Sequence, residues 1–186
     1  MAERQEATNL AGIEVKHKAR YEWAIPHCKN KIVMDFGCGV GYGSNMLATT
    51  ANYVFGYDRS AKAIAAARLH YQRSNIRFDI LDITTNKKNI GYELDTIVAL
   101  EVIEHITYSI KETLCILKNT LVKGGILVFS HPENETSGNK FHYHMQIKGD
   151  EIKRKLLPTI KFDLLDEWIQ PGNNRYDYHI YAIKSR

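Results

Sequence analysis

Short apolar runs separated by amphipathic stretches organise most of this chain. Five runs rich in β-branched and aromatic residues predict strands at 31–36, 53–57, 76–80, 95–100 and 125–130. Between them, 42–50 has the composition of a helix, Ser60 can cap an alanine-rich helix over 61–73, and 104–121 repeats apolar residues at close to helical spacing. Alternating strands and helices predict an α/β fold with a parallel sheet covered on both faces.

The C-terminal part has a different pattern. Residues 161–170 and 175–184 alternate between apolar and polar side chains, and Pro171-Gly172-Asn173-Asn174 between them is a strong turn signal. This segment therefore predicts a β-hairpin.

Length and composition fit one globular enzyme domain. The chain has 186 residues, 44% hydrophobic and 25% charged, and its net charge of +4 is too mild to predict nucleic-acid binding. Cys28, Cys38 and Cys115 show no C-x-x-C spacing, which favours a reducing cytoplasm over a disulfide framework or a cysteine-rich zinc site. No apolar run approaches the length of a membrane span, so we expect neither secretion nor membrane anchoring.

The stretch from Met34 to Ser44 carries the first chemistry, because it places an acidic residue and alternating glycines at the end of a predicted strand. Such a loop can cradle a nucleotide-type cofactor, although a tight structural turn would also explain it. The dinucleotide fingerprint G-x-G-x-x-G would need glycine at position 42, which is Tyr42. Asp35 would be buried at the strand end, where a cationic ligand or backbone N–H groups could pair with it.

Five motifs in order carry a family resemblance. They are Asp35-Phe36-Gly37-Cys38-Gly39-Val40-Gly41, Tyr53 to Asp58, Ile76 to Ile83, Asp95 to His105, and Leu121 to Val128. In these the chain resembles the class I S-adenosylmethionine-dependent methyltransferases, whose first motif is an acidic residue followed by G-x-G-x-G. The resemblance covers about residues 20 to 186. It implies a Rossmann-like, doubly wound, seven-stranded sheet that is mostly parallel, with one antiparallel strand in the C-terminal hairpin.

The resemblance also implies how S-adenosylmethionine and its product S-adenosylhomocysteine are held. The backbone of Gly37, Cys38 and Gly39 would contact the methionine part, and Asp58, with Arg59 beside it, the ribose. Asp82 and Ile83 would contact the adenine, with Asp79 as the rival of Asp82. Leu100 and Glu101 would lie beneath the cofactor near the sulfonium. Tyr21 and Tyr42 could face that positive centre, or they could simply pack in the core.

Histidines near the cofactor edge are candidates for a base if the acceptor is a hydroxyl. They are His105, His131, His142 and His144. His105 stands out because a helix starting at this point could place it on one face with Glu101, at i and i+4. The structural alternative is that Glu104 and His105 only cap and charge the start of a helix.

The Glu-x-x-Glu-His motif also resembles that of the small-RNA 3′-terminal 2′-O-methyltransferases. If that resemblance extends to a metal, it implies that Glu101, Glu104, His105 and either His142 or His144 hold a divalent ion. The same motif is similar to those of methyltransferases acting on small molecules and sugars, including the ubiquinone-pathway O-methyltransferases. Without the RNA-type resemblance we predict no metal.

Together these patterns predict a cytoplasmic methyltransferase that acts on an oxygen of a glycan or small metabolite. The segment Lys16 to Trp23, with 139–152, resembles bacterial and phage methyltransferases linked to surface glycans. The alternatives are a metal-dependent ribose 2′-O-methyltransferase of RNA, a non-catalytic binding module, and a dehydrogenase, which would need a separate substrate-binding half. We expect one domain over 1–186: an N-terminal helical cap (1–30), a cofactor-binding core (31–130), a substrate-side loop and helix (131–160), and the hairpin (161–186). The sequence does not indicate an oligomeric state.

Overall fold

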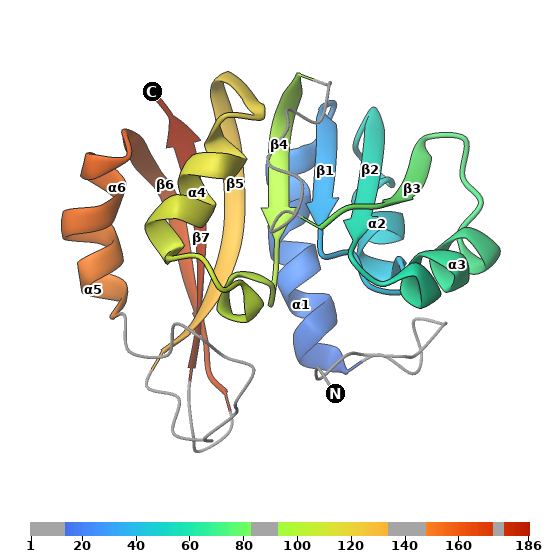
Figure 1. The fold of residues 1–186 in the computed structure, drawn as a ribbon, viewed down its shortest axis with the longest axis horizontal. Helices are drawn as coiled ribbons and strands as arrows, with labels where there is room; N and C mark the ends of the chain where they lie inside the picture. The colour runs from blue at the N-terminus through green and yellow to red at the C-terminus, as the bar shows by residue number, and fades with distance from the viewer. Residues whose placement is uncertain (1–13, 83–92, 134–147, 173–176) are drawn as a thin grey trace.

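One mixed sheet organises the computed structural model, which describes residues 14–82, 93–133, 148–172 and 177–186. Within these residues seven strands pair in the order β3-β2-β1-β4-β5-β7-β6 (Figure 1). The first five run parallel, and β7 runs antiparallel between β5 and β6. This confirms the predicted Rossmann-like sheet with a single antiparallel strand in a C-terminal hairpin. The strands are β1 (Ile32–Phe36), β2 (Tyr53–Asp58), β3 (Ile76–Ile80), β4 (Leu94–Ala99), β5 (Leu121–Glu133), β6 (Phe162–Gln170) and β7 (Asp177–Ser185).

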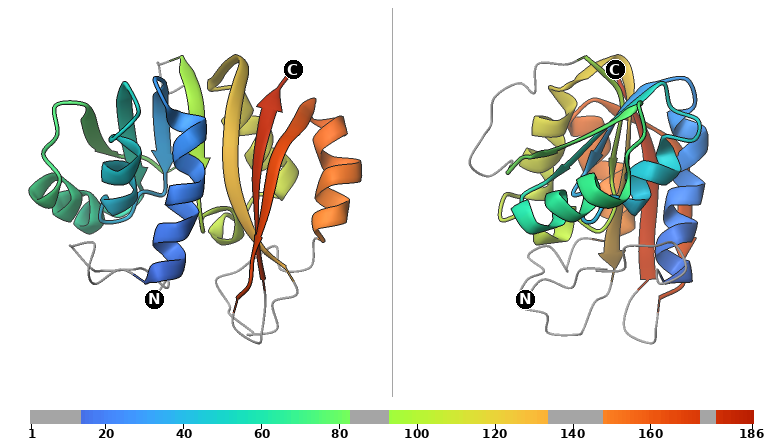
Figure 2. Two further views of the ribbon diagram at one scale, coloured as in Figure 1. Left: turned by 180° about the vertical axis from the view of Figure 1, so that it is seen from behind. Right: turned by 90° about the vertical axis from the view of Figure 1, so that its right-hand side faces the viewer.

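Helices cover both faces of the sheet (Figure 2). On one face, α1 and α2 pack over β1 and β4, and on the other, α4 and the helical segment α5-η4-α6 pack over β4, β5 and β7. The helical elements are α1 (Val15–Ala24), η2 (Ile25–Cys28), α2 (Tyr42–Leu47), α3 (Ala61–His70), η3 (Ile103–His105), α4 (Ile110–Lys118), α5 (Gly149–Glu151), η4 (Ile152–Leu156) and α6 (Leu157–Thr159). No helix in the described ranges is long and apolar enough to span a membrane.

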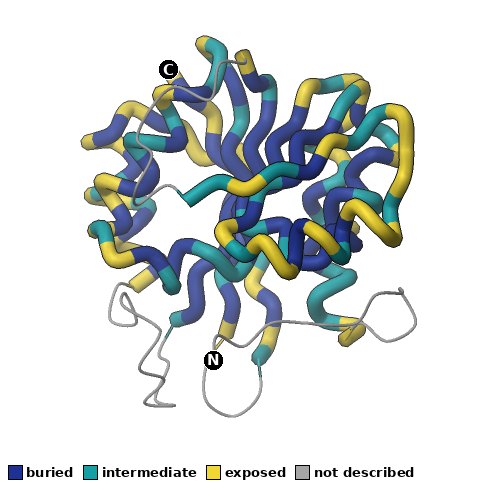
Figure 3. Tube along the Cα trace, turned by 45° about the vertical axis from the view of Figure 1, so that its right-hand side comes forward, coloured by how far each residue is buried: buried dark blue, intermediate teal, exposed yellow. Residues whose placement is uncertain are grey.

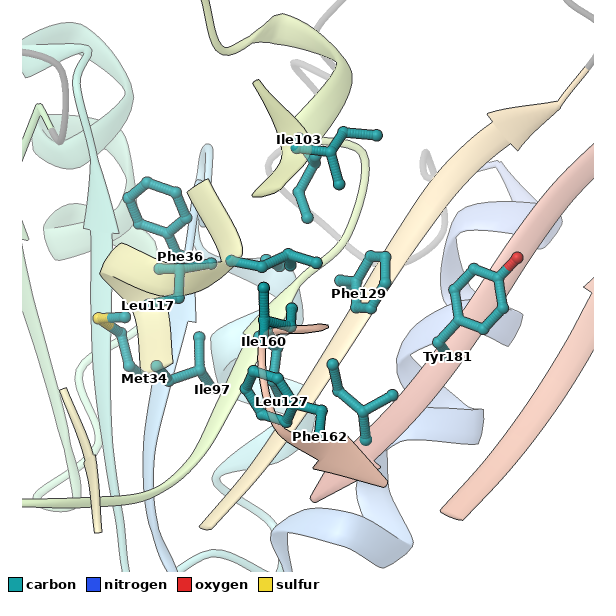
Figure 4. Close-up of a cluster of buried hydrophobic side chains, with 14 of the residues drawn as sticks. Met34, Phe36, Ile97, Ile103, Leu117, Leu127, Phe129, Ile160, Phe162 and Tyr181 are labelled. Carbon is teal, nitrogen blue, oxygen red and sulfur yellow. The ribbon is translucent and has the colours of Figure 1, made fainter. Parts of the chain in front are cut away.

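The central strands read as continuous apolar runs because successive side chains enter two different cores. Val33 of β1 packs beneath α1 and α2, whereas its neighbour Met34 packs beneath α4. Val98 and Ile97 of β4 divide in the same way. Figure 4 shows the second core, whose members include Met34, Ile97, Leu117 of α4 and Phe129 of β5. Figure 3 shows the strands as the most deeply buried part of the trace.

The region after β4 departs from the predicted helix over 104–121. The described backbone forms the short turn η3, and α4 begins only after Ser109. Ser109 and Glu112 form a capping box, in which each side chain accepts a hydrogen bond from the other's backbone N–H. Glu101 has a left-handed backbone with φ of 56°. The prediction that Glu101 and His105 share one face of a helix is therefore wrong, because no helix connects them.

Other helix ends were overestimated by a few residues. Helix α2 ends at Leu47 and α3 at His70, whereas Ser60 caps α3 as predicted by accepting a hydrogen bond from the backbone N–H of Ala63. In the hairpin, residues 173–174 of the predicted turn lie outside the described residues.

Candidate functional site

In the glycine loop between β1 and α2, one glycine is required by packing and another borders open space. Gly37, Gly39 and Gly41 all have positive φ, which only glycine adopts without strain. A Cβ at Gly41 would meet Ala67 and Phe78 at 2.8 Å, so that glycine is required by packing. A Cβ at Gly39 would meet nothing within 4 Å. The backbone at Gly39 therefore borders open space, as a ligand cradle requires.

Asp58 at the end of β2 lies beside this open position. One carboxylate oxygen accepts a hydrogen bond from the N–H of Gly39 at 3.0 Å, and the other from the N–H of Ser60 at 2.8 Å. Asp58 is 6% exposed. Because each carboxylate oxygen has two acceptor positions, Asp58 keeps the capacity to accept hydrogen bonds from ribose hydroxyls. The structure thus fits the predicted ribose role of Asp58, and it places Arg59 at the surface.

Asp35 of β1 supports the glycine loop through hydrogen bonds. It is fully buried, and it accepts hydrogen bonds from the hydroxyls of Ser44 at 2.6 Å and Tyr21 at 3.2 Å, with the Ser44 backbone N–H as a further donor. The sequence predicted that backbone N–H groups or a cationic ligand would pair with Asp35. A backbone N–H does so, and the hydroxyls of Ser44 and Tyr21 are additional partners that the sequence did not predict. Burial outweighs these hydrogen bonds and raises the pKa of Asp35 to about 6.

The side chains of Tyr21 and Tyr42 pack next to Asp35. Their rings meet edge to face, with centroids 5.4 Å apart, and both are buried. The Tyr21 ring also fills the space where Gly43 lacks a side chain, since a Cβ there would lie 2.0 Å from the ring. These contacts account for both tyrosines as packing residues. Their proposed orientation toward a sulfonium stays a prediction.

The two candidate residues for adenine binding, Asp79 and Asp82, differ in their contacts and position. Asp79 forms ion pairs with Arg68 at 3.0 Å and Arg77 at 3.1 Å on the outer side of β3. Asp82 lies partly exposed just after β3, at the carboxyl edge of the sheet. This placement favours Asp82 over Asp79. Ile83 lies outside the described residues.

Glu101 lies two residues after the end of β4 and has partners on several elements, and Leu100 before it is buried. Its backbone N–H donates to the Ser130 hydroxyl at 2.7 Å. Its carboxylate forms an ion pair with Arg20, lies 2.9 Å from His17 Nδ1, and accepts a hydrogen bond from the Tyr178 hydroxyl at 3.5 Å. A non-glycine residue in the left-handed region costs about 1–3 kcal/mol and persists where the surroundings enforce it. Strain together with this many partners makes Glu101 a candidate functional residue.

Arg20 joins the Glu101 network to the hairpin. It is 3% exposed, its Nε donates to Gln170 at 2.6 Å, and its guanidinium lies 3.9 Å above the Tyr178 ring. The sequence did not identify Tyr178 as a site residue, and it included His17 and Arg20 only in the segment Lys16 to Trp23, which resembles glycan-linked methyltransferases. The one available signal was spacing: His17, Arg20, Tyr21 and Ala24 follow i, i+3, i+4, i+7 along α1.

The remaining histidine and metal candidates are dispersed. His131 is fully buried in β5, opposite His179 of β7, and His105 lies half-buried in η3. His142 and His144 lie outside the described residues. Across the described part of the chain, no three histidine, cysteine, aspartate or glutamate residues gather to hold a metal ion. The implied metal set therefore stays a prediction, and within the described residues Glu101 is paired with Arg20 and lies against His17.

A second polar cluster lies where the hairpin meets α5. Glu133 bonds His179 Nε2 at 2.7 Å and accepts the N–H of Gly149 at 3.2 Å. Lys153 of η4 bonds Glu167 of β6 at 2.9 Å. These contacts tie the end of β5 to the start of α5.

Comparison with known proteins identifies the class. A family model described as a methyltransferase domain matches residues 27–166, so the chain belongs to this family. This confirms the predicted class, a class I S-adenosylmethionine-dependent methyltransferase.

Individual relatives are distant. The chain is 26% identical over 162 residues to a probable S-adenosylmethionine-dependent methyltransferase of Mycolicibacterium smegmatis, covering 81% of this chain and 59% of the relative. It is 29% identical over 163 residues to a ubiquinone biosynthesis O-methyltransferase of Azoarcus, covering 84% and 67%. The chain spans little more than half the length of its mycobacterial relatives.

Solved structures share the fold. Magnesium protoporphyrin IX methyltransferase from Synechocystis with bound S-adenosylhomocysteine superposes with a TM-score of 0.73 at 22% identity, covering 96% of this chain and 88% of that one. The N-methyltransferase NodS from Bradyrhizobium japonicum, also with S-adenosylhomocysteine, gives 0.74 at 18% identity, covering 91% and 85%.

Proposed function

We propose that this chain binds S-adenosylmethionine and catalyses transfer of its methyl group to an oxygen of a small metabolite or glycan in the cytoplasm. The observation that carries the proposal is the Gly39–Asp58 pair. An open backbone position and a buried carboxylate lie together at the carboxyl edge of the sheet, where ligands of doubly wound folds bind.

The bound cofactor would supply an activated methyl group on a sulfonium. The chain's own residues bind and orient it. Gly37 to Gly39 present backbone to the methionine part, Asp58 accepts hydrogen bonds from the ribose, and Asp82 lies where the adenine would end. No protein nucleophile is needed, because holding two reactants in line supplies much of the acceleration.

An oxygen acceptor is supported by the relatives, several of which are ubiquinone biosynthesis O-methyltransferases. The metal-dependent RNA alternative has less support, because Glu101, its first ligand, is paired with Arg20 and His17. A cytoplasmic setting is supported by the three cysteines, which are all free thiols. The division into cap, core, substrate-side segment and hairpin is likewise part of the proposal.

Two measurements test the proposal. Calorimetry should show binding of S-adenosylhomocysteine and no comparable binding of NAD. Incubation with tritiated-methyl S-adenosylmethionine and separate pools of RNA, glycans and metabolites should then label the glycan or metabolite pool at oxygen. Tighter binding of NAD would refute the cofactor assignment, and label confined to RNA or to nitrogen would refute the acceptor assignment.

A further inference from the structure

The edge of the sheet opposite the cofactor residues is formed by the end of α4, the starts of β5 and β6, and the end of β7 (Figure 1). Strand register brings these ends together, since Lys184 pairs with Ile126 near the start of β5 and Ser185 pairs with Phe162 at the start of β6. The candidate site lies at the carboxyl ends of β1, β2 and β4, so the two edges are separate surfaces.

Basic side chains gather at this opposite edge. Lys118 at the end of α4 donates from Nζ to the carbonyls of Ile160 and Lys161, both at 2.8 Å. The backbone N–H of Arg186 donates to the same Lys161 carbonyl at 3.1 Å. Burial, together with the positive charges of Lys161 and Arg186, lowers the pKa of Lys118. These cations are therefore close enough to repel one another.

Lys184 and Lys123 extend the group along β7 and β5. The Cε atom of Lys184 lies 3.5 Å from the position that a Cβ on Gly124 would take, and Lys123 directly precedes that glycine. Both lysines are exposed, as is Lys161. Within the described ranges, none of these three lysines forms an ion pair with a carboxylate. We call Lys118, Lys123, Lys161, Lys184 and Arg186 the basic patch.

Asp163 of β6 offsets part of this charge. Its carboxylate accepts a hydrogen bond from Arg186 Nε at 2.8 Å. This hydrogen bond, and the charges of Arg186 and Lys184, lower the pKa of Asp163. Because Asp163 neutralises Arg186 first, the positive charge left over in the basic patch rests on its lysines.

Lys161 adopts a strained backbone to stand in this patch. It follows α6 with a φ of 57°, in the left-handed region that glycine usually occupies after a helix. A non-glycine residue in that region is a reason to look for a function of its side chain. Here the side chain adds an exposed positive charge that glycine would not supply.

We propose that the basic patch binds the phosphate backbone of double-stranded nucleic acid without reading its sequence. Unpaired, exposed lysines suit such contacts, because neutralising phosphates releases counterions and needs no shaped pocket. A single strand fits less well, because it also needs rings on which bases stack, and Phe162 beneath Lys118 is only 1% exposed. A protein partner would need an apolar centre, whereas the residues of the basic patch are all charged.

The net charge of +4 did not indicate this surface, because a sum over the whole chain does not show where unpaired charges gather. Elsewhere, exposed cations have acidic partners: Arg154 and Lys155 of η4 pair with Asp150 and Glu151 at i,i+4. The proposal does not depend on which acceptor is methylated.

Fluorescence anisotropy with a labelled DNA duplex of about 20 base pairs tests the proposal, over about 20 to 200 mM KCl. The logarithm of the association constant should fall linearly with the logarithm of the salt concentration, with a slope of roughly −3 to −4. This slope corresponds to three or four phosphate contacts at about −0.9 each. No binding at the lowest salt concentration would overturn the proposal.

Single substitutions locate the surface. Lys123→Gln and Lys184→Gln should each weaken binding about eightfold at about 100 mM salt and reduce the slope by about one. Asp163→Asn should strengthen binding, because it frees Arg186. Lys155→Gln is the matched control, with the same charge change on a side chain 78% exposed on η4, and should change affinity less than about twofold. Equal losses in the control and the patch variants would show that only net charge matters, and would overturn the patch.

Lys161→Gly separates binding from stability. It should weaken duplex binding as the other patch variants do, whereas its melting temperature should not fall, because glycine relieves the left-handed backbone. Undiminished binding by Lys161→Gly would remove Lys161 from the surface.

Two further measurements distinguish other ligands and other sites. Affinity for S-adenosylhomocysteine should be unchanged in every patch variant, and S-adenosylhomocysteine should not displace the duplex. Displacement would place the duplex at the cofactor edge and overturn the proposal. Binding to vesicles of phosphatidylserine and phosphatidylcholine without binding to the duplex would assign the patch to a lipid surface instead.

Discussion

Replacement of Asp35 by asparagine should change how stability depends on pH. The pKa of this fully buried carboxyl is raised by burial from its usual 3.8 to about 6. A raised pKa means that the folded chain binds this proton more tightly than the unfolded chain does. The stabilisation from the proton is fully present below the unfolded value and is lost as the pH rises through the folded value.

The size of the effect follows from the shift. Two pKa units correspond to about 3 kcal/mol in total, of which about 1.4 kcal/mol develops between roughly pH 5 and 7.5. The asparagine side chain carries no charge, so the free energy of unfolding of Asp35→Asn should rise relative to wild type by that amount over this range. Lost hydrogen bonds to Ser44 and Tyr21 would add an offset that does not depend on pH, because those hydroxyls do not titrate there.

Urea denaturation at a series of pH values, followed by tryptophan fluorescence, measures this difference directly. The contributions of other titrating groups to the pH dependence are the same in both proteins and cancel in the difference. Asp79→Asn is the control, since Asp79 lies at the surface between two arginines and its removal relieves no buried charge. A pH-independent difference between Asp35→Asn and wild type would refute the assignment of Asp35 as a carboxyl destabilised by burial.

Three other changes test separate parts of the structure. Asp58→Ala should weaken S-adenosylhomocysteine binding more than tenfold, about 1.4 kcal/mol, in calorimetry, whereas Asp79→Ala should not; equal affinity would exclude the ribose role. Gly43→Ala should destabilise the fold by about 1–3 kcal/mol in urea, because its methyl group would overlap the Tyr21 ring, and a neutral result would mean that the ring moves freely. Ser109→Ala should cost about 0.5–2 kcal/mol through loss of the α4 cap, and wild-type stability would show that the cap is unimportant.

Local patterns predicted the sheet and the conformation of the glycine loop well, for physical reasons. The strands of a sheet buried on both faces are apolar throughout, and a loop built on positive φ angles needs glycine at fixed positions. The start of α4 was missed because Ile106 and Ile110 continue the apolar spacing across η3. The conformation of Glu101 was not predictable either, since a left-handed glutamate is stabilised only by tertiary partners.

The Glu101 network was harder to predict than the glycine loop. Gly39 and Asp58 belong to two consecutive motifs of the family resemblance, whereas His17 and Glu101 belong to no shared pattern and meet only in the folded chain. Nothing in the residues around His17 indicates that a carboxylate lies against its Nδ1. Sequence reasoning therefore paired Glu101 with His105, which stands close to it in the chain.

The fastening of α1 to the end of the hairpin has a consequence for synthesis on the ribosome. Lys16 bonds the carbonyls of Pro171 and Gly172, and Arg20 bonds Gln170, so α1 is held by a segment that is translated 150 or more residues after it. The glycine loop and its neighbouring strands are complete much earlier. A nascent chain can thus assemble its nucleotide-binding half while the Glu101 network waits for the hairpin, and contacts of such long sequence separation form late and slowly.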